Sequence, residues 1–149
     1  MTLELEYKKP FFTVNGKQMF DFSEHFSVEE LFATSKGDLL QMQNLRGVTF
    51  QVFRNLTRLT LVLEHIREYL GDVPLRISSA YRCGALNKAV GGVPTSNHRL
   101  GCAADIFVQS SEFFTNHLNK LKDIGILREV IDYGTFYHVA IPCYESFDY

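Results

Sequence analysis

The chain has 149 residues, 46% of them hydrophobic, which is enough for one domain with a substantial core. A net charge of −2 and dispersed Lys and Arg residues argue against binding to nucleic acid or to an anionic membrane. No run approaches the ~20 apolar residues of a membrane span, and residues 1–12 lack the layout of a secretory signal, so we expect a protein that is cytoplasmic as synthesised.

The N-terminal part contains two recognisable local signals. Asn15-Gly16 lies between alternating apolar residues, which predicts a hairpin flap over residues 1–22. Ser27 and Glu30 have the spacing of a capping box, so a helix should begin near residue 27. We expect a single domain over residues 1–149, with this flap, a core at 23–141 and a tail at 142–149.

A long amphipathic helix is the clearest element of the middle region. Between Val48 and Leu70, apolar residues recur at steps of three and four, and Gly71 follows as the stop signal. The later elements are expected in this order: a strand entering a loop within 73–82, a short helix at 83–90, a buried strand at 103–108, a helix at 110–125, and two strands within 126–142 joined near Tyr133-Gly134. Helices first and strands later indicate an α+β fold, with a mainly antiparallel sheet and helices packed on one side.

The cysteines do not form a recognisable pattern. Their odd number and spacing match neither a disulfide framework nor a zinc ribbon, so we expect all three to be reduced: Cys83, Cys102 and Cys143. Cys102 is expected to be a small buried residue rather than a ligand. Three of the histidines are expected to be solvated: His25, His65 and His117.

Three further residues could hold a metal ion. His98 and Asp105 stand seven positions apart with small residues between them, and His138 lies on a predicted strand that can neighbour the strand of Asp105. Two imidazoles and one carboxylate are typical of a catalytic zinc site, because three protein ligands leave a fourth position open. The small residues would let the loop fold tightly and give access to the ion.

Spacing alone leaves other interpretations open. A buried histidine on a strand is more often hydrogen-bonded within the core, and an aspartate at a strand start is often a cap. A metal-free domain therefore remains an alternative at this point.

A longer ordered pattern resembles the zinc peptidases of the D-Ala-D-Ala carboxypeptidase family, over roughly residues 22–141. The matching positions are Ser78-Ser79-Ala80-Tyr81-Arg82, Leu86-Asn87, Val90-Gly91-Gly92, Ser96-Asn97-His98, Gly101, Ala103, Asp105 and His138-Val139. The resemblance implies a fold and metal-site architecture shared with lysostaphin-type peptidases and the hedgehog signalling domain. It also implies that His98, Asp105 and His138 bind one Zn²⁺.

The resemblance further implies a substrate site. Arg82 would hold a carboxylate or carbonyl of the peptide, and Ser96 would line the same site; a guanidinium fork suits a carboxylate. In most of the family the general base is an acid three positions before the last histidine, where this chain has Thr135. Asp132 is the catalytic residue we expect instead, provided that the strand bends near Gly134; otherwise it is a turn residue. Glu129 and Glu145 are weaker candidates.

The function implied is zinc-dependent hydrolysis of a peptide bond next to a D-amino acid in peptidoglycan stem peptides. The enzyme would be a carboxypeptidase or an endolysin-type endopeptidase, a monomer, and either phage-encoded and delivered to the cell wall or an intracellular recycling peptidase. The departure at Thr135 keeps a second hypothesis, a catalytically weak or inactive zinc-stabilised binding or structural module on the same fold.

Overall fold

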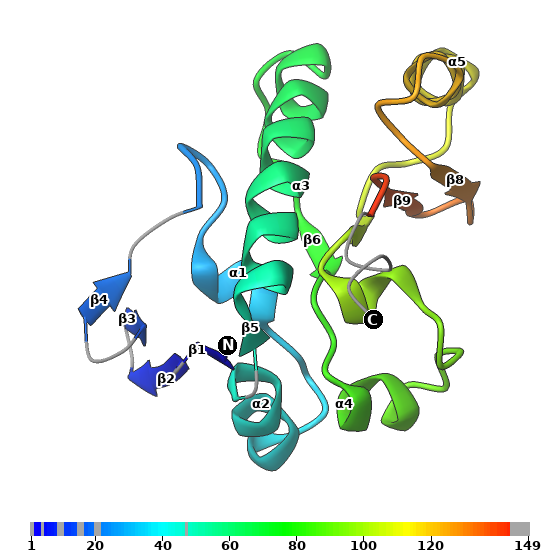
Figure 1. Ribbon diagram of the computed structural model, residues 1–149. Coiled ribbons are helices and arrows are strands. Elements are labelled where there is room, and N and C mark those ends of the chain that lie inside the picture. The colour runs from blue at the N-terminus through cyan, green and yellow to red at the C-terminus, as the bar shows by residue number, and fades with distance from the viewer. Residues whose placement is uncertain are drawn as a thin grey trace.

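The computed structural model describes residues 2–3, 5–8, 11–14, 17–19, 22–46 and 48–143. The expected α+β class is confirmed, because helices combine with sheets whose described strand pairs are all antiparallel. Figure 1 shows the long helix α3 (Phe50–Tyr69) between a small N-terminal sheet and a four-stranded sheet. Within the described ranges, no helix has both the length and the apolar character needed to cross a bilayer.

The N-terminal strands form two small sheets. Strand β1 (Thr2–Leu3) pairs with β5 (Val48–Thr49). Strands β2 (Leu5–Lys8), β3 (Phe11–Val14) and β4 (Lys17–Met19) form a three-stranded sheet in chain order. Val14 lies opposite Lys17 across the β3–β4 pair, and the predicted turn residues Asn15 and Gly16 lie outside the described part of the chain.

Two short helices precede α3. Helix α1 (Val28–Phe32) begins with the predicted capping box, in which the Ser27 hydroxyl accepts from the Glu30 N–H and the Glu30 carboxylate accepts from the Ser27 N–H. Helix α2 (Asp38–Leu45) was not predicted, and only its last two residues, Asn44 and Leu45, are buried. So short a buried face leaves almost no apolar period to detect.

Helix α3 was predicted over residues 48–70 and forms the centre of the core. The Thr49 hydroxyl caps its N-terminus by accepting from the Val52 N–H. Five of the six predicted apolar positions are buried against the sheet and the other helices, and the sixth, Leu70, is partly buried: Val52, Leu56, Leu59, Leu63 and Ile66 are the buried five. The helix ends before Gly71, whose φ of 94° is accessible to glycine at little cost.

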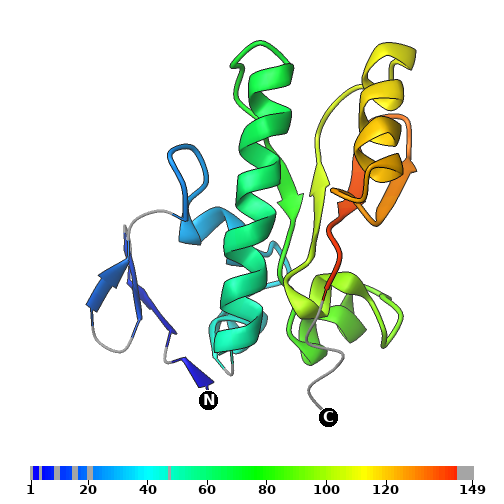
Figure 2. The same cartoon turned by 45° about the horizontal axis from the view of Figure 1, so that its top comes forward.

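The four-stranded sheet has the strand order β6 (Ile77–Ser79), β7 (Ala103–Ile106), β9 (Tyr137–Ala140) and β8 (Glu129–Asp132). Helices α3 and α5 (Glu112–Asp123) lie on the same side of this sheet, as Figure 2 shows. Alternate residues of β7 and β9 pack against these helices: Ala104, Ile106, Tyr137 and Val139. The residues between them therefore face the opposite side of the sheet. Helix α4 (Gly84–Ala89) and the 3₁₀ helix η1 (Asn97–Leu100) connect β6 to β7.

The expectation that all cysteines are reduced is wrong for two of them. Cys102 and Cys143 form a disulfide, while Cys83 is free. The two bonded residues flank the paired strands β7 and β9, and the Ile141 N–H donates to the Cys102 carbonyl at 2.8 Å. Strand pairing therefore brings together cysteines that are 41 positions apart in sequence, which spacing alone does not indicate.

Candidate metal centre

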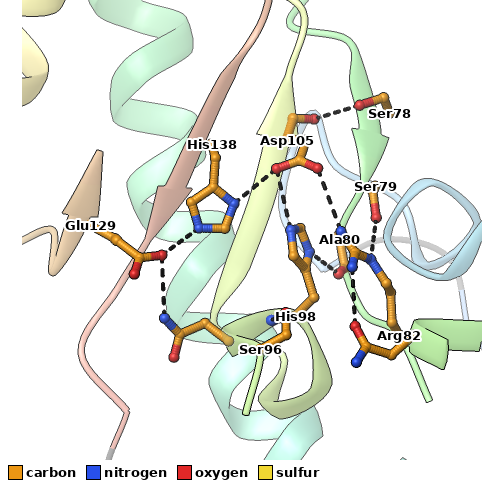
Figure 3. Close-up of polar contacts among 11 residues, drawn as sticks. Ser78, Ser79, Ala80, Arg82, Ser96, His98, Asp105, Glu129 and His138 are labelled. Carbon is orange, nitrogen blue, oxygen red and sulfur yellow. Dashed lines mark hydrogen bonds and ion pairs between the residues drawn. The ribbon is translucent and has the colours of Figure 1, made fainter. Parts of the chain in front are cut away.

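Three potential metal ligands meet on the face of the sheet that is turned away from α3 and α5. Asp105 of β7 lies directly opposite His138 of β9, and His98 enters from η1. Asp105 Oδ1 is 3.2 Å from His98 Nε2 and 3.0 Å from His138 Nδ1 (Figure 3). One ligand atom from each residue lies within 4.8 Å of the other two, so this metal triad could hold a single ion.

His98 is fixed in position and in tautomer by the backbone around it. The residue is 2% exposed, and the Ser96 hydroxyl accepts from its N–H at 3.2 Å, which caps η1. Its Nδ1 lies 2.7 Å from the Ala80 carbonyl. Because a carbonyl can only accept, Nδ1 must carry the hydrogen, and the lone pair of Nε2 faces Asp105.

His138 is oriented by a carboxylate in the same way. Its Nε2 lies 2.5 Å from Glu129 Oε1, so this nitrogen donates and the lone pair of Nδ1 faces Asp105. A second acceptor that fixes the tautomer of a histidine is the usual arrangement around metal-ligating imidazoles. With both rings neutral, electron pairs from three side chains converge on one point, which is unfavourable unless a cation lies between them.

The protonation of the metal-free triad follows from this convergence. Burial raises the pKa of Asp105, but hydrogen bonds with His138 and His98 outweigh it and hold that pKa well below its ordinary value. Burial lowers the pKa of His138, but hydrogen bonds with Asp105 and Glu129 outweigh it and raise the pKa above its ordinary value of 6.5. Without metal, a proton on His138 supplies the positive charge that the triad requires.

Arg82 lies beside the triad with its guanidinium held on two sides. Its Nε donates to the Ser79 hydroxyl, its Nη1 donates to Asn87 Oδ1, each at 3.1 Å, and its Nη2 lies 3.7 Å from Asp105 Oδ2. The side chain is 13% exposed. Burial lowers the pKa of Arg82, while the neighbouring charge of Asp105 opposes that shift.

The Leu-Asn and Gly-Gly elements of the sequence pattern position this arginine. Asn87 accepts from Arg82 and donates from Nδ2 to the Val93 carbonyl at 2.8 Å, so it ties the guanidinium to the loop that follows α4. A Cβ atom at Gly92 would lie 2.2 Å from Asn87 Oδ1 and 2.9 Å from Arg82 Nη1. Only glycine leaves room for the pair.

The small residues between His98 and Asp105 serve packing rather than access to the ion. Gly101 has a φ of 75°, and a Cβ atom there would lie 2.9 Å from the Val52 carbonyl oxygen of α3. The three residues that follow are fully buried: Cys102, Ala103 and Ala104. This close approach to α3 lets the segment turn tightly enough for both of its ends to reach the same face.

The structure does not bring Asp132 to the triad. Ile131 lies opposite His138, whereas Asp132 lies opposite Tyr137, on the helix side of the sheet. Its carboxylate accepts from the Ser110 hydroxyl at 2.5 Å and from the Gly134 N–H at 2.8 Å, and both bonds lower its pKa. Asp132 is thus bound within the β8–β9 turn, and the bend needed to direct it toward the metal triad is absent from this turn.

Glu129 is the acidic residue that reaches His138, although from sequence alone it is a weaker candidate than Asp132. It begins β8 and, two residues before Ile131, points to the same face as His138. Its side chain is 43% exposed. Thr135 is exposed in the turn, and Glu145 lies outside the described residues.

Comparison with known protein families identifies a relationship for most of the chain. The family model described as Peptidase M15 matches residues 24–140 of the chain. A search of curated proteins finds no match.

Proposed function

Because the chain belongs to the peptidase M15 family, a family of zinc D-Ala-D-Ala carboxypeptidase-like enzymes, we propose that it hydrolyses a peptide bond next to a D-amino acid in peptidoglycan stem peptides. The observation that carries the proposal is the convergence of one carboxylate and two oriented imidazole lone pairs on a single point.

His98, Asp105 and His138 are the proposed zinc ligands. Two imidazoles and one carboxylate form a donor set typical of catalytic rather than structural zinc. Zinc bound there would supply Lewis acidity, which lowers the pKa of water to roughly 7 and polarises the scissile carbonyl. The hydrogen bonds on the far ring nitrogens keep both imidazoles in the tautomer that the metal requires.

Glu129 is the general base that we propose in place of Asp132. Its Oε1 accepts from His138, and its partly exposed carboxylate has a second oxygen that can take a proton from the attacking water. The same carboxyl group can then return the proton to the leaving amine. Asp132 is held on the other face of the sheet by Ser110 and Gly134 and is not part of this proposal.

Arg82 is the proposed partner of a substrate carboxylate. Ser79 and Asn87 hold its guanidinium beside Asp105, so its donors are oriented before a peptide binds. A D-alanine terminus or a D-glutamate side chain supplies a carboxylate of the required charge. The Ser96 hydroxyl accepts from His98 but can still donate its own hydrogen, so its predicted contact with the peptide remains part of the proposal.

A zinc-stabilised binding or structural module is the second candidate, and one contact favours it. Glu129 bonds to the nitrogen of His138 that points away from the triad, which is the position of a residue that orients a ligand. If Glu129 does only this, the chain binds zinc and peptide but turns over slowly or not at all.

Digestion of purified peptidoglycan, with products identified by mass spectrometry, tests the proposal. We expect the wild-type chain to release peptides cut next to a D-amino acid and a chelator to stop the release. Glu129→Gln keeps an oxygen that accepts from His138, so it should retain zinc yet lose at least about a hundredfold in rate. Asp132→Asn, the matched control, should retain activity.

Two other results would change the assignment. If the zinc-loaded wild-type chain releases no product, the module is favoured. If Glu129→Gln hydrolyses peptidoglycan at the wild-type rate, then Glu129 is a positioning residue and not the base.

A further inference from the structure

A second pair of histidines lies on the helix side of the sheet, away from the metal triad. His65 of α3 and His117 of α5 have their Nε2 atoms 3.1 Å apart. Each histidine directly precedes a fully buried residue, Ile66 or Leu118, whose packing fixes the helix around it. The histidine pair therefore connects two helices whose contacting residues are 52 positions apart in sequence.

A stack of aromatic rings holds one of the two imidazoles in place. The His117 ring lies flat on Tyr69, with centroids 3.4 Å apart and an interplanar angle of 4°. Tyr69 in turn stacks on Phe113, with centroids 5.3 Å apart. Tyr69 is one helical turn after His65, and Phe113 is one turn before His117, so each helix contributes two side chains to the cluster. The cluster thus directs the Nε2 of His117 toward His65 before any ligand binds.

The separation of the two nitrogens matches that of two ligands on one ion. With zinc to nitrogen bonds of about 2.0–2.1 Å, two imidazole nitrogens on a shared ion lie roughly 3–3.4 Å apart. His65 is exposed, which leaves the remaining coordination positions open to water.

We propose that His65 and His117 form a second metal site, which binds a transition-metal dication such as Zn²⁺, Ni²⁺ or Cu²⁺ through both Nε2 atoms and links α3 to α5. Imidazole pairs suit these ions and not Mg²⁺ or Ca²⁺, which prefer oxygen ligands. With only two protein ligands, the site binds more weakly than the triad. It is separate from the proposed peptidase site, because the sheet lies between them.

Equilibrium dialysis of the untagged full chain against Zn²⁺, followed by elemental analysis, tests the second site. We expect two ions per wild-type chain at saturation. His65→Ala and His117→Ala should each lower the affinity for the second ion at least tenfold and leave the affinity for the first ion unchanged. His25→Ala is the matched control, since His25 is also an exposed histidine near α3 but bonds to Glu64 instead. This variant should still bind two ions.

Thermal unfolding gives a second readout that does not depend on activity. Added Ni²⁺ should raise the melting temperature of a wild-type chain loaded with one equivalent of Zn²⁺, which fills the triad first, and should not raise that of the equally loaded His65→Ala variant. The side chain of His65 is exposed, so its truncation leaves the core intact even if His117→Ala fails to fold. A wild-type chain that binds a single ion which His65→Ala retains, or a His65→Ala variant that binds two with wild-type affinity, overturns the second site. Neither result bears on hydrolysis at the triad.

Discussion

At the level of single residues, the metal triad is defined as much by its hydrogen-bond acceptors as by its ligands. The Ala80 carbonyl and the Glu129 carboxylate each take the hydrogen of the imidazole nitrogen that points away from Asp105. Without these acceptors, each ring could turn its N–H toward the carboxylate and form an ordinary hydrogen bond. The acceptors therefore turn a possible buried hydrogen-bond network into a site that favours a cation.

This arrangement predicts that zinc affinity falls as the pH is lowered. The raised pKa of His138 means that a proton occupies the metal-free triad at mildly acidic pH, and zinc must displace it. Competition with one proton weakens the apparent affinity about tenfold for each pH unit below the pKa of His138. Zinc titrations at about pH 6 and about pH 8 measure the effect. Equal affinities at the two values would contradict it.

In the metal-free chain, the contribution of His138 to folding stability has the opposite pH dependence. The stabilising contribution of charged His138 is complete below its ordinary pKa of 6.5 and is lost as the pH rises through its raised pKa. The contribution of Asp105 is present above its ordinary pKa of 3.8 and is lost as the pH falls through its lowered pKa. Metal-free and zinc-loaded chains should therefore differ most in stability above neutral pH.

A second prediction at this level concerns Gly92. Gly92→Ala places a methyl group 2.2 Å from the side-chain Oδ1 of Asn87, so that side chain must move and Arg82 loses an acceptor. If Arg82 binds the substrate carboxylate, KM should rise roughly tenfold while the zinc content stays the same. Steady-state hydrolysis of a stem peptide measures the change. Gly84→Ala is the control, because a Cβ atom there would lie 3.6 Å from a nitrogen of the flexible Arg99 side chain, which is an ordinary contact. A similar rise in KM for both variants would contradict the assigned role of Gly92.

At the level of elements, features that depend on residues close in sequence could be predicted, whereas the register of the strands could not. The amphipathic period of α3 and the capping box of α1 depend on residues close in sequence, and both predictions were confirmed. Which acid faces His138 depends on how many residues the β8–β9 turn contains. The register places Ile131 opposite His138, and this one fact directs Glu129 to the triad and Asp132 away from it.

The contact between the histidines of α3 and α5 was not predicted either, because it too depends on residues that are distant in sequence. His65 and His117 are 52 positions apart, and each reads alone as a solvated helix residue. Only the packing of the two helices on the sheet brings them into contact. The same holds for the Cys102–Cys143 disulfide, which depends on the pairing of β7 with β9.

That disulfide carries a prediction at the level of elements. It closes a segment with a sequence separation of 41 residues, and loop-closure entropy estimates its contribution at about 4 kcal/mol to the free energy of unfolding. Reduction by a phosphine should therefore lower the melting temperature. Zinc binding should persist, because the β7–β9 ladder holds Asp105 and His138 together without the bond. As a control, Cys83→Ser removes only the free thiol and should leave the melting temperature of the oxidised chain unchanged. If reduction of the wild type does not lower its melting temperature, the prediction is wrong.

At the level of the whole molecule, the four-stranded sheet separates two surfaces with different chemistry. Its helix side buries the core against α3 and α5, and its other side carries the metal triad and Arg82. The side chains of β7 and β9 alternate between these two roles. A substitution at Asp105 or His138 should thus change metal binding with little effect on core packing, which makes the site separable from the fold.

Metal removal tests the coupling between site and fold. The triad joins η1, β7 and β9, three segments that an unfolded chain does not hold together, so zinc should bind the folded state alone. At a free zinc concentration of 100 times Kd, such binding adds about 3 kcal/mol and should raise the melting temperature by roughly 5–10 °C. Calorimetry with and without a chelator measures this shift, and the His65→Ala background excludes any contribution from the second site. When His98→Ala is added to that background, zinc should no longer shift the melting temperature. If His98 is intact and the zinc-loaded and chelated chains still melt at the same temperature, the triad does not bind the ion.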